Sequence, residues 1–341
     1  MIPGTRRVLR LGRASLLWQP RPLRVALILL LALLALAVIL LGTGTMQLSP
    51  AEVLRALLGL SEDPVAARIL HYVRLPRVLT AAAVGAALGL AGAAFQSISR
   101  NPLGSPDVIG FTTGAATGAI ALLVSGAALA SPFGTAAAAA TSGMLTALAV
   151  LLLARRGGGY RLVLIGIGVG AMLTGLNTLL LARGSLDRVM SAQLWLAGSL
   201  EARNWDHVRI ALAGLILFAP VLAALSRRLA LLEMGDDMAR QLGLPVARTR
   251  GLAVLAAVGL TSLATAAAGP IAFIALATPQ IARRLTRSPG LPLGTSALTG
   301  ATLMLAADWI GQSAPAGLVL PIGLVTGALG GIYLLLVLTR S

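Results

Sequence analysis

The side chains that carry most acid–base and metal chemistry are scarce in this sequence. Its 341 residues include 11 acidic residues, two histidines and no cysteine. Without cysteine there can be no disulfide, thiolate metal site or cysteine nucleophile. His71 and His207 lie far apart in loop-like sequence without clustered partners, so solvated histidines are favoured over a metal site. The sequence also has no HExxH and no GxxxxGK[ST] phosphate loop, which disfavours a membrane enzyme and excludes ATP hydrolysis through such a loop.

The densest group of carboxylates lies in the stretch LLEMGDDMARQLGLPVARTR, residues 231–250, between two long apolar runs. Gly235 can break the chain before a new helix. Asp236 and Asp237 then fall at the helix start, where acidic side chains complement the helix dipole. A glycine followed by Pro245 can end the helix. The pattern predicts a short, capped, amphipathic helix that a docked partner could grip, with Met238, Leu242 and Leu244 on one apolar side. The alternative is a solvated connector.

The composition indicates that this helix projects from a membrane domain. The chain is 57% hydrophobic and 11% charged, with a mean hydropathy of +0.90, whereas a soluble domain has about 25% charged residues. Many runs reach the roughly 20 apolar residues that cross a bilayer. We predict an all-α polytopic membrane protein with a basic segment at 1–24 and one membrane domain at 25–341. About ten spans are expected, at residues 25–43, 78–97, 107–127, 134–154, 161–182, 210–226, 250–268, 271–286, 294–311 and 318–338.

The basic residues are all arginine and give a formal net charge of +16. They are scattered at span ends without interleaved aromatic residues, so membrane topology explains them better than nucleic-acid binding. With the N-terminus inside, 19 arginines fall on the cytoplasmic side and eight on the other, which accounts for all 27. Both termini are therefore expected in the cytoplasm. The first apolar run resembles a signal peptide but is longer and lacks a cleavage site, so we read it as an uncleaved span.

Few ionisable groups fall in the middle of the predicted spans. Ion-coupled transporters usually carry buried carboxylates or broken helices there as coupling sites. Because this chain shows little of either and has no phosphate loop, the energy for uphill transport would have to come from a partner. Gln96 and Asn177 are polar residues that could line a path, or could equally join helices by hydrogen bonds. Four GxxxG pairs predict close helix packing: Gly85/Gly89, Gly114/Gly118, Gly166/Gly170 and Gly323/Gly327.

Five ordered stretches together resemble one family, the iron–siderophore and vitamin B12 type permeases of ABC importers (FecCD-like). The resemblance runs from about residue 48 to residue 338 and implies the type II ABC importer permease fold. The stretches are RLPRVLTAAAVGAALGLAGAAFQSISRNPLGSPDVIG (74–110), WLAGSL (195–200), EMGDDMARQLGL (233–244), AGPIAFIALATPQIARRL (268–285) and LPIGLVTGALGGIYL (320–334).

The resemblance implies ATP-driven import of a ferric siderophore, a catecholate of enterobactin type, across the inner membrane by a subunit that is not itself an enzyme. Within the family, the motif sequences resemble those of G-type subunits most, which implies a heterodimer with a homologous D-type permease. Two ABC ATPase copies would bind ATP and Mg, and a siderophore-binding protein would deliver the cargo. No cofactor of this chain and no nucleic acid is expected. Haem, cobalamin or another iron chelate is the alternative cargo, and an ion-coupled secondary transporter is the alternative class.

The resemblance also implies roles for individual residues. Arg74 and Arg77 match outward-facing arginines that pair with acidic residues of the binding protein, and Asn101 and Leu103 match a cytoplasmic gate. The ATPase-coupling segment matches Glu233, Met234, Gly235, Asp236, Asp237, Arg240, Gln241, Leu242 and Gly243.

The sequence departs from the family pattern at several of these places. Gln312 stands four residues after Asp308, where most relatives carry arginine. Gln280 replaces a histidine, and Val319 replaces a glutamate that is common in relatives. These departures fit a heterodimer with asymmetric contacts, and they weaken the expectation that both arms of the binding protein dock through Arg–Glu pairs.

Overall fold

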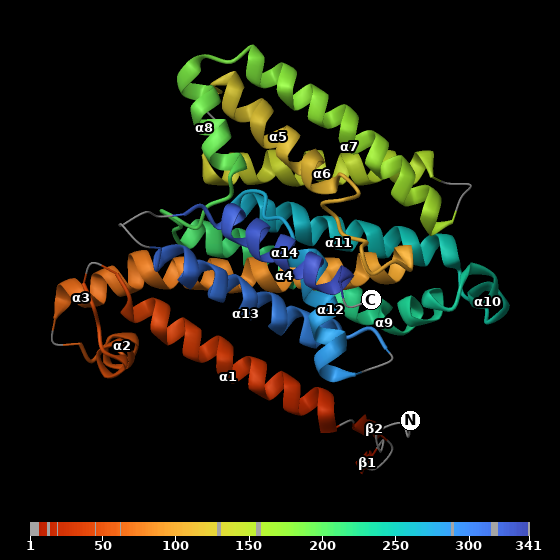
Figure 1. Cartoon of the computed structure of the whole chain (residues 1–341), viewed down its shortest axis with the longest axis horizontal. Helices are drawn as coiled ribbons and strands as arrows, with labels where there is room; N and C mark the ends of the chain where they lie inside the picture. The colour runs from red at the N-terminus through yellow and green to blue at the C-terminus, as the bar shows by residue number, and fades with distance from the viewer. Residues whose placement is uncertain are drawn as a thin grey trace.

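The computed structural model describes residues 7–11, 14–18, 20–44, 46–61, 63–127, 131–154, 158–287, 290–314 and 320–339. Val319 lies outside the described residues. Most of the described chain is helical (Figure 1). The helices are α1 (Pro20–Gly42), α2 (Pro50–Leu57), α3 (Pro64–Ile69), the π-helix η1 (Leu70–Arg74), α4 (Leu75–Ser99), α5 (Phe111–Ser125), α6 (Pro132–Leu153), α7 (Gly159–Ala182), α8 (Leu186–Leu196), α9 (Trp205–Glu233), α10 (Asp236–Gln241), α11 (Val246–Ala268), α12 (Ile274–Thr286), α13 (Leu293–Gln312) and α14 (Ile322–Leu338).

The predicted spans all coincide with helices. By length and composition, six helical stretches of the described chain could cross a bilayer: α1, the continuous run Pro64–Ser99, α6, α7, α9 and α11. The remaining four predicted spans fall on α5, α12, α13 and α14. Two details differ from the prediction. The span expected from residue 107 begins only at Phe111, because a turn that ends at Gly110, with φ of +84°, precedes it. The basic segment contains a short antiparallel hairpin, β1 (Arg7–Leu11) with β2 (Ala14–Trp18).

α4 forms the centre of the bundle and is buried along almost its whole length. It packs against α13, α11, α9 and α12, with α7 at one edge of the bundle and α1 at the other (Figure 1). Glycine makes this packing close. A Cβ on Gly85 would overlap the Gly300 carbonyl of α13, and one on Gly92 would overlap the Ala275 carbonyl of α12. At every glycine of the predicted GxxxG pairs except Gly327, an added Cβ would overlap a backbone or side-chain atom of another part of the chain.

The loops and short helices gather at two opposite ends of the molecule. α2 and α3 lie at one end, together with α8, and α10 lies at the other, together with the N-terminus of α1 (Figure 1). We call these the α2 end and the α10 end. The arginine distribution predicts that the α10 end faces the cytoplasm. Residues of the predicted docking and coupling sites therefore lie at opposite ends of the bundle.

The close approach at Gly92 predicts that two chemically identical substitutions have opposite effects. Gly251→Ala in α11 meets nothing within 4 Å and should leave stability unchanged or raise it by up to about 1 kcal/mol through helix propensity. Gly92→Ala should lower it by about 1–3 kcal/mol, because the methyl group must displace backbone. Thermal unfolding of the purified full chain in detergent measures both, and an equal effect at the two glycines would contradict the packing described.

Candidate functional site

The segment between α9 and α11 folds as the sequence predicts. α9 ends at Glu233, and Gly235 adopts φ of +111°, a conformation that L side chains rarely enter. α10 then begins at Asp236 and ends at Gln241. Gly243, with φ of +77°, turns the chain toward α11. Glycine at both ends of a six-residue helix explains why such a short element has sharp boundaries.

Asp236 ties this segment to the rest of the molecule. Its side chain is only 13% exposed. Its carboxylate accepts a hydrogen bond from Arg250 of α11 at 2.7 Å, and Arg100, at the end of α4, lies 3.9 Å away. Arg240 of α10 itself is 4.0 Å away. Asp237 is 92% exposed and pairs with Arg240. The two neighbouring carboxylates therefore differ in role: Asp236 anchors the helix, and Asp237 faces solvent.

The opposite side of the segment presents apolar side chains to solvent. Met234 is 62% exposed, Met238 46% and Leu242 56%. Met238 and Leu242 are four residues apart along α10 and its C-terminal end, so they share one face, and Met234 precedes them at the end of α9. The sequence predicted an apolar side formed by Met238, Leu242 and Leu244, but Leu244 is buried in the core. We call Met234, Met238 and Leu242 the α10 apolar surface. Exposed apolar patches mark interaction sites, and methionine adapts readily to a partner.

The predicted gate residues lie on the loop that follows α4, also at the α10 end. The Asn101 side-chain oxygen accepts a hydrogen bond from the Leu103 backbone N–H at 2.9 Å. The Asn101 carbonyl accepts another from Gly104 at 2.9 Å. Asn101 therefore shapes the turn, and both it and Leu103 are exposed. Gln280 of α12 donates to the Pro102 carbonyl at 2.8 Å, which ties the loop to the bundle.

A cavity of about 310 Å³ joins this loop to the coupling segment. At its wall, Glu233 at the end of α9 accepts a hydrogen bond from Arg283 of α12 at 2.6 Å. The side-chain oxygen of Gln280 also accepts a hydrogen bond from the Tyr333 hydroxyl of α14 at 3.4 Å. The sequence marked Gln280 only as a departure and did not single out Arg283. The cavity is lined by Gln96, Arg100, Asn101, Pro102, Glu233, Gln280 and Arg283.

The two residues predicted as path candidates do not form one site. Gln96 is buried and donates to the Leu276 carbonyl at 3.0 Å, so it joins α4 to α12 while lining the cavity. The start of α7, at Gly159, lies beside Ile98. Asn177 follows Gly159 by 18 residues, so it lies about 27 Å further toward the α2 end. Its side-chain oxygen is buried without a hydrogen-bond partner.

Arg74 differs from its predicted position. The sequence resemblance implied an outward-facing side chain, but Arg74 is only 8% exposed. Its guanidinium donates to the Leu41 carbonyl at 2.7 Å and also to the Met46 carbonyl. The last carbonyls of a helix have no hydrogen-bond partner within that helix. Arg74 supplies the missing donor to the Leu41 carbonyl in the last turn of α1. In this structure it anchors α1 and is not available to a docking protein.

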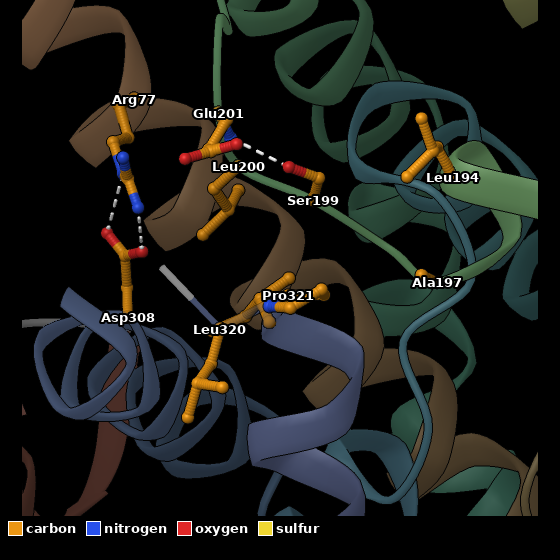
Figure 2. A pocket seen from close by; sticks show the side chains of 10 residues that line it. Arg77, Leu194, Ala197, Ser199, Leu200, Glu201, Asp308, Leu320 and Pro321 are labelled. Carbon is orange, nitrogen blue, oxygen red and sulfur yellow. Dashed lines mark hydrogen bonds and ion pairs between the residues drawn. The ribbon is translucent and has the colours of Figure 1, made fainter. Parts of the chain in front are cut away.

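Arg77 lies on the wall of a cavity at the α2 end, but it is already paired. It binds Asp308 of α13 through two hydrogen bonds, of 3.1 and 2.7 Å (Figure 2). Gln312 donates to the same carboxylate at 2.9 Å. The glutamine that departs from the family pattern therefore completes an internal network around Asp308. Glu201 lines the same cavity from the segment after α8 (Figure 2).

Comparisons with known proteins agree with this arrangement. The model of the FecCD transport family matches residues 29–340. The chain is 45% identical to the ferric enterobactin transport system permease protein FepG of Escherichia coli, over 88% of this chain and 91% of that protein. It is 40% identical to the achromobactin transport system permease protein CbrC of Dickeya dadantii, over 93% and 91%.

The fold also matches a solved structure. An inward-facing metal-chelate type ABC transporter superposes with a TM-score of 0.84 and 30% sequence identity. The match covers 93% of this chain and 99% of that one. Helix order and arrangement are therefore shared over nearly the whole described bundle.

The position of Arg74 predicts a stability effect that needs no partner protein. Arg74→Gln should destabilise the isolated chain by about 1–3 kcal/mol for each carbonyl left unsatisfied. Arg209→Gln is the control, because Arg209 is also at the α2 end but is exposed and forms a surface ion pair with Asp206, a kind of pair that contributes little to stability. Thermal unfolding in detergent separates the two. If both variants unfolded at the wild-type temperature, the anchoring role of Arg74 would be wrong.

Proposed function

The chain belongs to the FecCD transport family, and we propose that it is the G-type permease subunit of an ABC importer for a ferric siderophore of the catecholate, enterobactin type. It is a multi-pass membrane protein and a non-catalytic transport subunit. One observation carries the cargo assignment: the 45% identity to a ferric enterobactin permease extends over 88% of the chain. The assignment as a permease subunit is supported by the helical bundle and by the segment that contains α10.

ATP would act on this chain only through its partners. Two ABC ATPase copies bind ATP with Mg, and one of them seats the α10 apolar surface. Different residues of the coupling segment would contact the ATPase and transmit its movement. Met234, Met238 and Leu242 contact the ATPase, while Asp236 passes its movement to α11 through Arg250 and to the end of α4 through Arg100. No covalent bond of the cargo forms or breaks in this subunit.

The cytoplasmic gate would be the loop that carries Asn101 and Leu103. The loop follows Arg100 directly, so a shift of α10 reaches it through the ion pair between Asp236 and Arg100. The hydrogen bond from Gln280 ties the same loop to α12. This gives the gate a physical connection to the motor. The side chains that shape the turn then determine whether the loop closes the path or retracts from it.

The path would run between this subunit and a homologous D-type permease. α7 is a candidate for the path-facing helix, because it lies at the edge of the bundle (Figure 1) and carries exposed Met172 and Leu176. Asn177 belongs to the same helix, although its side-chain oxygen points into the protein and is buried. Gly168 and Gly175 leave open space for a bulky cargo.

A siderophore-binding protein would dock at the α2 end. Arg77 remains a candidate contact, because its side chain is partly exposed although paired with Asp308. Arg74 is withdrawn from this role by its burial. The arginine distribution supports an orientation with both termini in the cytoplasm, and the ABC importer assignment implies the inner membrane. The achromobactin relative favours a second candidate cargo, a different ferric siderophore carried by the same mechanism.

The α10 apolar surface predicts which substitutions uncouple the motor. Leu242→Asp places a carboxylate where an apolar contact is buried on docking, and should weaken ATPase binding by more than about 30-fold, as at an interface hot spot. Ala247→Asp adds the same charge at an exposed position of α11, outside that surface. Co-purification of the ATPase from membranes compares them. Equal retention of the ATPase by both variants would contradict the docking surface.

Uptake into proteoliposomes tests the function itself. The chain is co-expressed with its neighbouring permease, ATPase and binding-protein genes. We expect ATP-dependent uptake of iron-loaded enterobactin that requires the binding protein, and no uptake of free iron or cobalamin. An ATPase-active complex without enterobactin uptake would overturn the cargo assignment and leave another chelate. Failure to assemble with any ATPase would overturn the ABC permease mechanism and favour an ion-coupled transporter.

A further inference from the structure

A groove at the α10 end lies apart from every residue assigned above. It opens where the start of α1, the second half of α9 and the start of α13 meet, and its volume is about 650 Å³. Its lining is mainly apolar, with hydroxyl groups on two sides. Representative lining residues are Leu23, Ala26, Ala223, Ser226, Thr295 and Leu298. We call it the α1–α9 groove.

Three arginines belong to the segments that line the groove. Arg21 of α1 donates to the Leu285 carbonyl at 2.9 Å, which places its guanidinium beside the lining residue Thr286. Arg287 is exposed and follows Thr286 directly. Arg227 follows the lining residue Ala223 by four positions, so it lies on the same face of α9.

The positive charge at the groove is not balanced within the described part of the chain. No acidic residue lines the groove, and none of Arg21, Arg227 and Arg287 is in an ion pair there. The acidic residues of the coupling segment are used elsewhere: Glu233 pairs with Arg283, and Asp236 and Asp237 pair with other arginines. A bound anion would therefore meet uncompensated cations.

We propose that the α1–α9 groove binds an anionic phospholipid, with its phosphate at the three arginines and an acyl chain along the apolar lining. A phosphate alone would use only the rim, and a neutral lipid only the lining, whereas an anionic lipid uses both. Basic pockets between membrane helices on the cytoplasmic side suit anionic headgroups. The proposal rests on the topology that places the α10 end in the cytoplasm.

The bound lipid would add contacts to the least buried of the six helical stretches that could cross a bilayer. Only 17% of the most apolar window of α1 is buried, and α1 packs mainly on α13. A lipid in the groove bridges α1 to α9, with which α1 has little direct contact. It therefore stabilises the α10 end without touching the coupling segment or the gate loop.

Lipid titration of the full chain, read by native mass spectrometry, tests the proposal. The probes are short-chain phosphatidylglycerol, phosphatidylcholine of the same chain length, and inorganic phosphate. Wild type should bind phosphatidylglycerol in preference to the other two. Arg21→Gln and Arg227→Gln should each weaken this binding about fivefold. Arg228→Gln is the matched control, because Arg228 follows Ser226 by two positions and so points away from the groove.

A second variant tests the acyl part separately. Ala223→Trp fills the groove at an exposed position and should abolish the preference while the arginines remain. Thermal unfolding in phosphatidylcholine checks that each variant is folded. Equal binding of the two lipids, equal losses in Arg227→Gln and Arg228→Gln, or binding of phosphate as tight as that of phosphatidylglycerol would each overturn the proposal. Failure of uptake with this binding intact would affect only the proposed function.

Discussion

The carboxylate of Asp236 is the contact on which the α10 end depends. It lies within 4.0 Å of three arginines that come from α4, α10 and α11. Breaking one member of a buried ion pair costs far more than the pair contributes in total, because a charge is left without a partner. A shift of α10 is therefore coupled to α11 through the buried Asp236–Arg250 pair, and to the end of α4 through the longer contact with Arg100. These contacts hold a six-residue helix, which is too short to be stable alone, in a fixed position against the bundle.

The close packing of the other helices allows a movement of α10 to be transmitted through the bundle. α4 packs against α12 and α13 so closely that glycine is required at Gly92, Gly85 and Gly300. Tightly packed helices transmit displacement because they do not deform locally. The gate loop continues directly from α4, and Gln280 fixes it to α12. Docking, anchoring and gating are thus separated onto different residues of one connected end.

Local features of the sequence predicted the elements well, and long-range partners poorly. Apolar run lengths located the spans, and Gly235 with Gly243 marked the limits of α10, since both signals lie within one turn or one span. The inward position of Arg74 had no such signal, because the carbonyls that it binds belong to α1. Arg283 and Gln280 were missed for the same reason: their partners lie 50 and 178 residues away. The burial of Leu244 followed from tertiary packing, which helical periodicity does not encode.

The number of ATP molecules hydrolysed per siderophore imported, measured for Asp236→Asn in the reconstituted transporter, tests the central claim most directly. The substitution keeps the α10 apolar surface and the shape of the side chain but removes the charge that holds three arginines. The account predicts that the ATPase still assembles and hydrolyses ATP, while the ratio of ATP to cargo rises severalfold. An unchanged ratio, with normal uptake, would show that movement reaches the gate without the Asp236 contacts.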